Sequence, residues 1–142
     1  MTASGRAVVV EFRDSAAVLG PLRMLLASAG AGSLEILDLE FVRSIQGVPS
    51  TALASGVDSR LAACDALNTG LLSQADLDSI AAALTRGAMA AVVVYRGAPV
   101  SADVWTPGAV RVLLDGPVAA LDLAAAPGEG IDLLRDTQPP AG

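Results

Sequence analysis

Histidine and lysine are both absent from this chain of 142 residues, and cysteine occurs once, at Cys64. Without histidine, the chain cannot form a Ser-His-Asp or Cys-His catalytic unit or a histidine-containing zinc site. Without lysine, it cannot use a phosphate-binding P-loop lysine or a Schiff-base nucleophile. A single cysteine cannot form a disulfide within the chain, which is typical of a reducing compartment. We therefore expect a cytoplasmic protein.

The chain also has no apolar run long enough to cross a membrane, although its mean hydropathy is +0.57. A spanning helix needs about 20 mostly apolar residues. Arg23 interrupts the apolar stretch 19–26, and the run 88–95 ends at Arg96. Near the N-terminus only the residues AVVV separate Arg6 from Glu11, which is too short for a signal-peptide core. We expect no membrane partner.

Cations are few and scattered, since the nine basic residues are all arginine and occur singly. The formal net charge is −6, so neither nucleic acid nor an anionic membrane surface is an expected partner. Hydrophobic residues make up 53% of the chain, which is ample for one core. We predict a single α+β domain over residues 1–126. A flexible tail rich in proline and glycine is predicted over 127–142.

Alternation, β-branched runs and turn residues predict the secondary structure. Strands are expected over 7–13, 34–44, 48–54, 88–95 and 118–123. Helices are expected from Asp14 or Ser15 to about Ala29, over 58–68 and over 73–86, with a weak helical turn over 109–114. Pro21 predicts a kink or a first helical turn. Ser73 and Asp76 have the spacing of a capping box.

The order of these elements predicts a ferredoxin-like α/β sandwich, in which helices cover one face of an antiparallel sheet and leave the other face open. The alternative is a parallel sheet built from β-α-β units. It ranks second because the connection between Ser44 and Val48 is too short for a crossover.

The stretches AVVVEF, LEILDLEFVR and ACDALNTGLLSQADLDSIAAALTRGAMAAVVVY follow one another between residues 7 and 96. In this order they resemble a family of short acidic actinobacterial proteins defined by a domain of unknown function. Its members share an -IDLxFVR- strand, a hairpin, a -DAL-x-GLLSxxDI- helix junction and an -ALxPGxAAxxxV(W/Y)- strand. The resemblance implies no reaction and no catalytic residue.

After Arg96 the chain departs from that family, which continues with a long helix. Pro99, Pro107 and Pro117 interrupt any such helix here. The structure and role of residues 97–126 therefore stay open, and we expect a divergent C-terminal segment.

Acidic residues recur on one face of the strand 34–44. Its alternation places Leu37, Leu39 and Phe41 on one side, and Ile36, Asp38, Glu40 and Val42 on the other. Glu11 joins these acids if it lies on the same face of a neighbouring strand. Such a cluster either forms a polar solvent or interface face, or holds a hard cation or an acid of raised pKa. We favour the polar face and expect no metal.

Three further side chains have two interpretations each. Cys64 is either a small buried hydrophobe or a reactive thiol, and the buried role is favoured because no histidine activates it. Tyr95 and Trp105 are two of the few aromatic residues in the chain. They either fill the core, which is favoured, or line an apolar groove for a ligand or a partner.

These patterns favour a non-enzymatic, self-associating interaction or regulatory module, with no catalytic residue and no cofactor. A homodimer through the open sheet face is the expected assembly. The candidate interface or ligand residues are Glu11, Ile36, Asp38, Glu40, Val42, Tyr95 and Trp105. The alternative is a small cofactor-independent enzyme or a binder of a small apolar ligand, with a pocket between sheet and helices.

Overall fold

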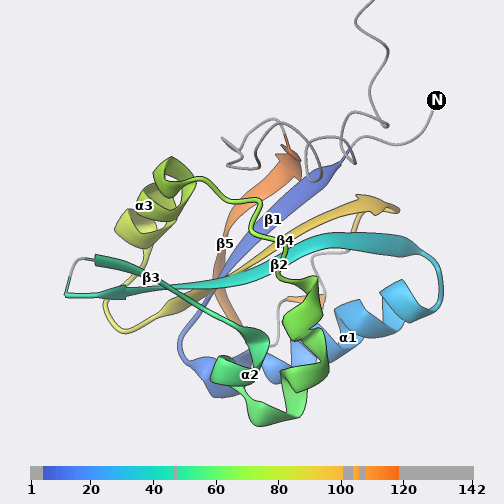
Figure 1. Ribbon diagram of the computed structural model, residues 1–142, viewed down its shortest axis with the longest axis horizontal. Coiled ribbons are helices and arrows are strands. Elements are labelled where there is room, and N and C mark those ends of the chain that lie inside the picture. The colour runs from blue at the N-terminus through green and yellow to red at the C-terminus, as the bar shows by residue number, and fades with distance from the viewer. Residues whose placement is uncertain (1–4, 47, 101–103, 106–107, 119–142) are drawn as a thin grey trace, which may run out of the picture.

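The computed structural model describes residues 5–46, 48–100, 104–105 and 108–118. Their core is a five-stranded sheet in the order β3-β2-β4-β1-β5, with every neighbouring pair antiparallel (Figure 1). Its strands are β1 (Arg6–Phe12), β2 (Leu34–Ile45), β3 (Val48–Ala52), β4 (Met89–Gly97) and β5 (Ala109–Pro117). The helices are η1 (Ser15–Ala17), α1 (Leu19–Gly30), α2 (Ala54–Val57), η2 (Ser59–Leu67) and α3 (Gln74–Ala83). The α+β class and the antiparallel sheet are confirmed.

The two central strands, β1 and β4, are apolar on both sides. Their sequences, RAVVVEF and MAAVVVYRG, are nearly continuous runs of valine and alanine, and almost every side chain in them is buried. Apolar runs of this kind are typical of strands that are covered on both faces, whereas a half-exposed strand alternates apolar with polar residues. The sheet therefore needs a layer on each side.

Helices supply both layers, which corrects the expectation that they cover one face only. On one face, α1 and η2 pack against Val8, Val10 and Val93. On the other face, Ile80 and Ala81 of α3 pack against a second cluster that includes Val9 and Val92. The face that was expected to stay open is thus buried beneath α3.

A β-bulge in β2 changes which side chains share a face. Ile36 pairs with Tyr95 and Asp38 pairs with Val94, so Leu37 is an extra residue between them. Ile36 consequently packs with the α1 side of the core, and Leu37 packs with Val94 on the α3 side. The expected positions of Ile36 and Leu37 were wrong for this one reason, because strict alternation fails at a bulge.

Two other segments differ from expectation. The predicted helical turn over 109–114 is part of β5, because the outer edge of β1 offers it a ladder from Arg6↔Pro117 to Phe12↔Ala109. The predicted helix over 58–68 is a 3-10 helix, and α2 begins at Ala54, where a strand was expected to end. Most of the strand predicted over 118–123, and the predicted tail over 127–142, lie outside the described residues.

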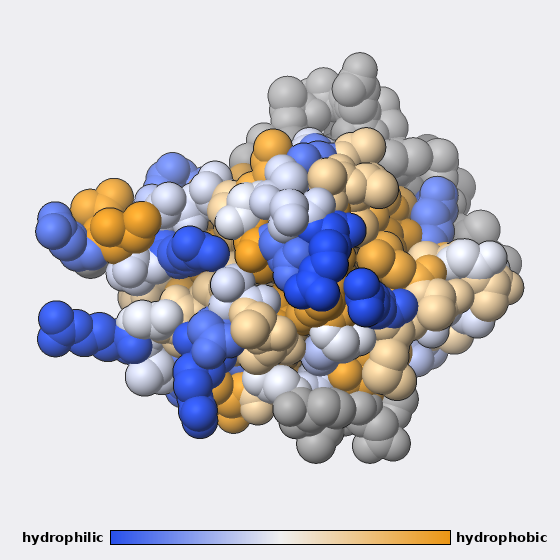
Figure 2. Space-filling model, turned by 90° about the horizontal axis from the view of Figure 1, so that it is seen from below, coloured by the Kyte–Doolittle hydropathy of each residue, from blue (hydrophilic) through white to orange (hydrophobic). Residues whose placement is uncertain are grey.

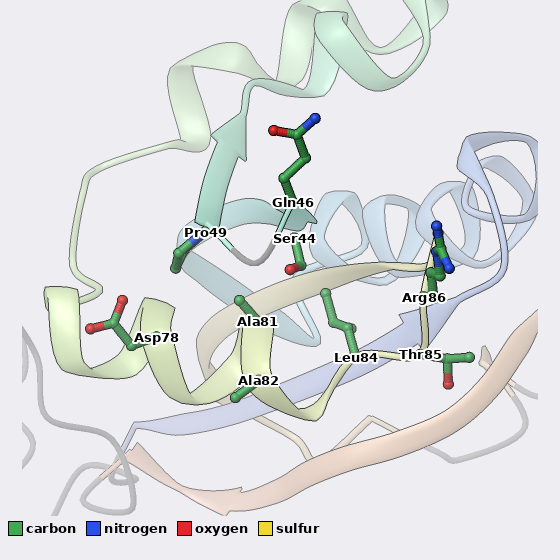
Figure 3. Close-up of a pocket in the computed structure, with 10 residues that line it drawn as sticks. Ser44, Gln46, Pro49, Asp78, Ala81, Ala82, Leu84, Thr85 and Arg86 are labelled. Carbon is green, nitrogen blue, oxygen red and sulfur yellow. The ribbon is translucent and has the colours of Figure 1, made fainter.

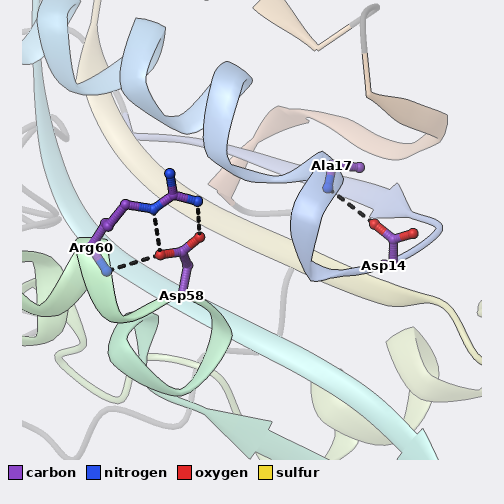
Figure 4. A network of polar contacts seen from close by, with 4 residues as sticks. All are labelled: Asp14, Ala17, Asp58 and Arg60. Atoms are coloured by element: carbon purple, nitrogen blue, oxygen red, sulfur yellow. Dashed lines mark hydrogen bonds and ion pairs between the residues drawn. The ribbon is translucent and has the colours of Figure 1, made fainter.

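Short polar side chains cap η1, η2 and α3, whereas α1 and α2 follow Val18 and Leu53 and have no side-chain cap. Ser73 and Asp76 form the predicted capping box of α3, and Pro21 lies in the first turn of α1. Asp14 accepts a hydrogen bond of 3.1 Å from the Ala17 amide at η1 (Figure 4). At the start of η2, Asp58 accepts bonds from the amide and the guanidinium of Arg60, which lower the pKa of Asp58 to about 2. No helix in the described ranges is both long and apolar enough to cross a membrane.

Candidate functional site

The segment between η2 and α3 is fixed to β2 by two buried carboxyl groups. The Thr69 amide donates to Asp38 Oδ1 at 2.7 Å, and the Leu71 amide donates to Asp38 Oδ2 at 3.3 Å. The Leu72 amide donates to Glu40 Oε2 at 3.2 Å. Free amides of an irregular segment need partners when they are buried, and these carboxyl groups supply them. The pair therefore holds this connection over the α3 face of the sheet.

Glu40 differs from an ordinary surface carboxyl group. Burial, followed by the hydrogen bond with Asp38 and the charge of Asp38, raises the pKa of Glu40 to about 8, and the charge of Asp76 adds to this effect. At neutral pH Glu40 is therefore mostly protonated, so it donates the hydrogen bond to Asp38 while it accepts one from the Leu72 amide. The favoured interpretation, a polar face in contact with solvent, does not hold for these buried acids, and the raised pKa of Glu40 comes from hydrogen bonds and burial inside the fold.

Glu11 meets the condition of lying on the same sheet face as Asp38 and Glu40, but it has different partners. Arg111 Nε of β5 donates to Glu11 Oε1 at 2.5 Å, and the Thr85 amide donates to Oε2 at 2.6 Å. Arg111 also donates to the Ala83 carbonyl at the end of α3. Burial opposes ionisation of Glu11, but the bonds from Arg111 and Thr85 outweigh it and hold the pKa of Glu11 below its ordinary value.

The three acids therefore do not converge on one point. Asp38 and Glu40 bind the segment that leads into α3, whereas Glu11 binds the residue that follows its last turn. In the described part of the chain, no group of three or more acidic or cysteine side chains has a geometry that could hold a metal ion. Each of these carboxyl groups joins the sheet to the α3 layer.

The predicted apolar interface residues are covered by the chain itself. Val42 is completely buried beneath α3, and Ile36 packs on the opposite face against the α1 side. The predicted homodimer through an open face containing both residues is therefore wrong, because that face is not open.

Tyr95, Trp105 and Cys64 all belong to the core on the α1 side. The Tyr95 hydroxyl accepts a hydrogen bond of 3.1 Å from the Val100 amide, which satisfies its buried polar atom. Burial, with the nearby Asp65, raises the pKa of the Cys64 thiol and so disfavours the reactive thiolate. The core interpretation of all three residues is confirmed.

A cavity of about 800 Å³ opens between the end of the β2–β3 hairpin and the C-terminal half of α3. We call it the hairpin slot (Figure 3). Its lining residues are Ser44, Gln46, Pro49, Asp78, Ala81, Ala82, Leu84, Thr85, Arg86 and Gly87. It contains neither Tyr95 nor Trp105, so the aromatic pocket that the sequence suggested is not the cavity that forms.

The slot exists because the hairpin is longer than its neighbour. The ladder between β2 and β4 ends at the pair Arg43 and Met89, but β2 continues to Ile45 and pairs only with β3 beyond that point. The protruding end carries Ile45 and Val48, which face each other across the hairpin and are 57% and 62% exposed. Figure 2 shows this end as an apolar group at the left that stands out from the body.

Sequence reasoning singled out no residue of the slot. Thr85, Arg86 and Gly87 were expected to belong to the end of a helix, and Ser44 to the end of a strand. One sequence feature could have indicated the slot: the strand that ends near Ser44 is longer than the strand that starts at Ala88. This difference is informative only once the two strands are known to pair. Comparisons with protein-family models, curated proteins and solved structures find no match for this chain.

Proposed function

We propose that the chain is a non-enzymatic interaction module that self-associates through the protruding end of the β2–β3 hairpin. The observation that carries this proposal is the exposed cross-strand pair Ile45 and Val48. Two aliphatic side chains side by side in water on a projecting hairpin are stabilised when a partner covers them. A second copy presents the same pair, and a two-fold axis brings the two pairs together.

The state of the acidic residues supports a non-enzymatic role. The carboxyl groups accept hydrogen bonds from backbone amides of the segments at either end of α3, and they belong to Asp38, Glu40 and Glu11. A general acid or base must reach the atoms of a substrate, and these groups face the interior of the fold. The single cysteine is buried, which suits a protein that stays in the cytoplasm.

A ferredoxin-like core is part of the same proposal. Strands β1 and β2 are joined by α1 and lie on either side of β4, which is the split arrangement of that fold. Strand β3 and helix α3 are then additions, one at the sheet edge and one on its second face.

Self-association is tested by sedimentation velocity across a concentration series. The wild-type chain should form a dimer, and the double substitution Ile45→Lys, Val48→Glu should give a folded monomer. Opposite charges across the strands preserve the hairpin in this variant. Met24 is 51% exposed on α1, so Met24→Lys is a matched control that should remain dimeric. A monomeric wild-type chain, or a double variant with unchanged dimer affinity, would contradict the proposal.

A ligand-binding protein is the second candidate. The volume of the hairpin slot favours it, since cavities that hold small ligands measure about 300–1,000 Å³.

A further inference from the structure

We propose that the hairpin slot binds an extended peptide segment of about four residues, with a basic residue toward Asp78 and an acidic residue toward Arg86. The slot lies on the α3 side of the hairpin, whereas Ile45 and Val48 follow the alternation to its other side. This inference is therefore independent of the proposed self-association.

The first support is the unpaired edge of β2 beside the slot. Ser44 pairs with Pro49 and Ile45 pairs with Val48, but neither has a partner in β4. Backbone groups on an unpaired strand edge accept an added strand, because main-chain hydrogen bonds bind a peptide with little regard to its sequence. An extended peptide that enters the slot continues the sheet at the place where β4 is missing.

The second support is the charge at the two ends of the slot. In Figure 3, Asp78 and Arg86 lie at opposite ends, and Ala81, Ala82 and Leu84 lie between them. Within the described residues, Arg86 takes part in no ion pair. The Asp78 carboxylate accepts a hydrogen bond of 3.0 Å from the Gln74 amide group, and this neutral partner leaves its charge available.

The slot is bounded at the arginine end, where Gly87 separates it from a cavity on the other side of the sheet. A second cavity, of about 230 Å³, shares Gly87 with the slot and is lined by Arg43, Asp14, Ser15 and Met89. The Asp14 carboxylate there already accepts from the Ala17 amide. Arg43 pairs with Met89 on the α1 side, so this second cavity adds no cation to the slot.

The length of the slot sets the size of the ligand. Asp78 lies in α3, and Arg86 lies three residues beyond the end of α3 at Ala83. The five helical steps cover about 7.5 Å, and the non-helical residues 84–86 carry Arg86 further from Asp78 (Figure 3). An extended chain covers about 3.3 Å per residue, so about four residues join the two ends. A free amino acid is too short to reach both charges, and a polyanion would place negative charge against Asp78.

The test is an NMR titration of the isotopically labelled chain with three capped tetrapeptides, Lys-Val-Val-Glu, Glu-Val-Val-Glu and Lys-Val-Val-Lys. The first should shift the amide signals of Ser44, Gln46 and Thr85 more strongly than the other two. Arg86→Gln should weaken its binding about two- to fivefold, which corresponds to the loss of one solvent-exposed ion pair. Arg23→Gln, a change on the exposed side of α1, is the matched control and should leave binding unchanged.

The same titration on the Ile45→Lys, Val48→Glu variant separates the two proposals. Peptide binding that survives in this variant supports the slot, whatever its oligomeric state. The slot proposal is overturned if no tetrapeptide shifts these amides at millimolar concentration. It is overturned equally if all three peptides bind alike, or if Arg86→Gln binds as the wild-type chain does.

Discussion

Asp38 and Glu40 lie on the buried face of β2, where burial and the hydrogen bond between them raise the pKa of Glu40 to about 8. Each also accepts from backbone amides of the connection that leads into α3. Two like charges this close do not both ionise without cost, so one proton stays with the pair. The fold therefore binds a proton at neutral pH that the unfolded chain releases.

This proton makes stability depend on pH in a defined direction. Unfolded Glu40 titrates near 4.5, and folded Glu40 near 8. Between these values the folded state holds more protons, so the free energy of unfolding should fall as pH rises. The contribution is complete below 4.5 and is lost as pH passes through about 8. Urea unfolding of the wild-type chain across this range measures the slope.

Glu40→Gln should flatten that slope. A glutamine side chain keeps the geometry of protonated Glu40, because its NH₂ can donate to Asp38 while its oxygen accepts from the Leu72 amide. The variant should match the wild-type stability at about pH 5 and exceed it above about pH 8. Glu35→Gln changes an exposed carboxylate on the same strand and should retain the wild-type slope. Parallel slopes for Glu40→Gln and wild type would show that Glu40 is ionised in the fold.

Arg111 should stabilise the fold despite being half exposed. Its partner Glu11 is fully buried, so Arg111→Met leaves a buried carboxylate with the Thr85 amide as its main donor. We expect a loss of about 1–3 kcal/mol in the free energy of unfolding at neutral pH. The additional change Glu11→Gln should recover part of this loss, which a double-mutant cycle detects. Additive effects of the two changes would contradict a direct interaction.

The lowered pKa of Glu11 gives this ion pair its own pH dependence. A carboxyl group whose folded pKa is depressed contributes stability above its unfolded value of 4.5, and the contribution is lost as pH falls through the folded pKa. The difference in the free energy of unfolding between the wild-type chain and Arg111→Met should therefore become smaller as the pH falls. Unfolding free energies of both proteins, compared at neutral and at acid pH, test this.

Cys64 should behave as a core residue. Cys64→Ser places a hydroxyl group among apolar atoms and should lower the free energy of unfolding by about 1–3 kcal/mol. Native protein should react slowly with a thiol reagent at neutral pH, because the thiol is buried and its pKa is raised. The same reagent applied to protein in urea gives the reference rate. Native labelling as fast as that reference would overturn the core role.

The capping box of α3 offers a local test of helix stability. Ser73→Ala removes the hydroxyl acceptor for the Asp76 amide, at 3.0 Å, and should cost about 1 kcal/mol. Ser79→Ala, on the exposed side of the same helix, should cost nothing measurable. Thermal unfolding of the two variants, followed by circular dichroism, compares them directly.

Local patterns were enough to predict strands β1 to β4, the start of α3 and the shared face of Asp38 and Glu40. Each depends on neighbours within a few positions in the chain, such as Ser73 and Asp76. Cys64 was correctly expected in the core because the chain has no histidine to activate the thiol. Tyr95 and Trp105 were correctly expected there because large aromatic side chains most often fill a core.

Other features depend on pairing between distant segments and could not be predicted locally. The bulge at Leu37 appears only when β2 is aligned with β4, and β5 forms only because β1 presents a free edge. The second helical layer was signalled by the doubly apolar valine runs of β1 and β4, which were interpreted as one-sided. The hairpin slot arises because β2 extends beyond the end of β4, and this difference cannot be found in the sequence of either strand alone.

The bulge at Leu37 also determines where β2 can change in length. Ile36 and Asp38 already lie on opposite faces, so deleting Leu37 would restore regular alternation and leave every other β2 side chain on its present face. The loss would be limited to the contacts of Leu37 with the cluster around Val94 and Leu71. A deletion of Leu39 would instead move the side chains on one side of the deletion to the opposite face of the sheet, so they would no longer pack in their own core cluster. Within this strand, a single-residue deletion is therefore least harmful at Leu37.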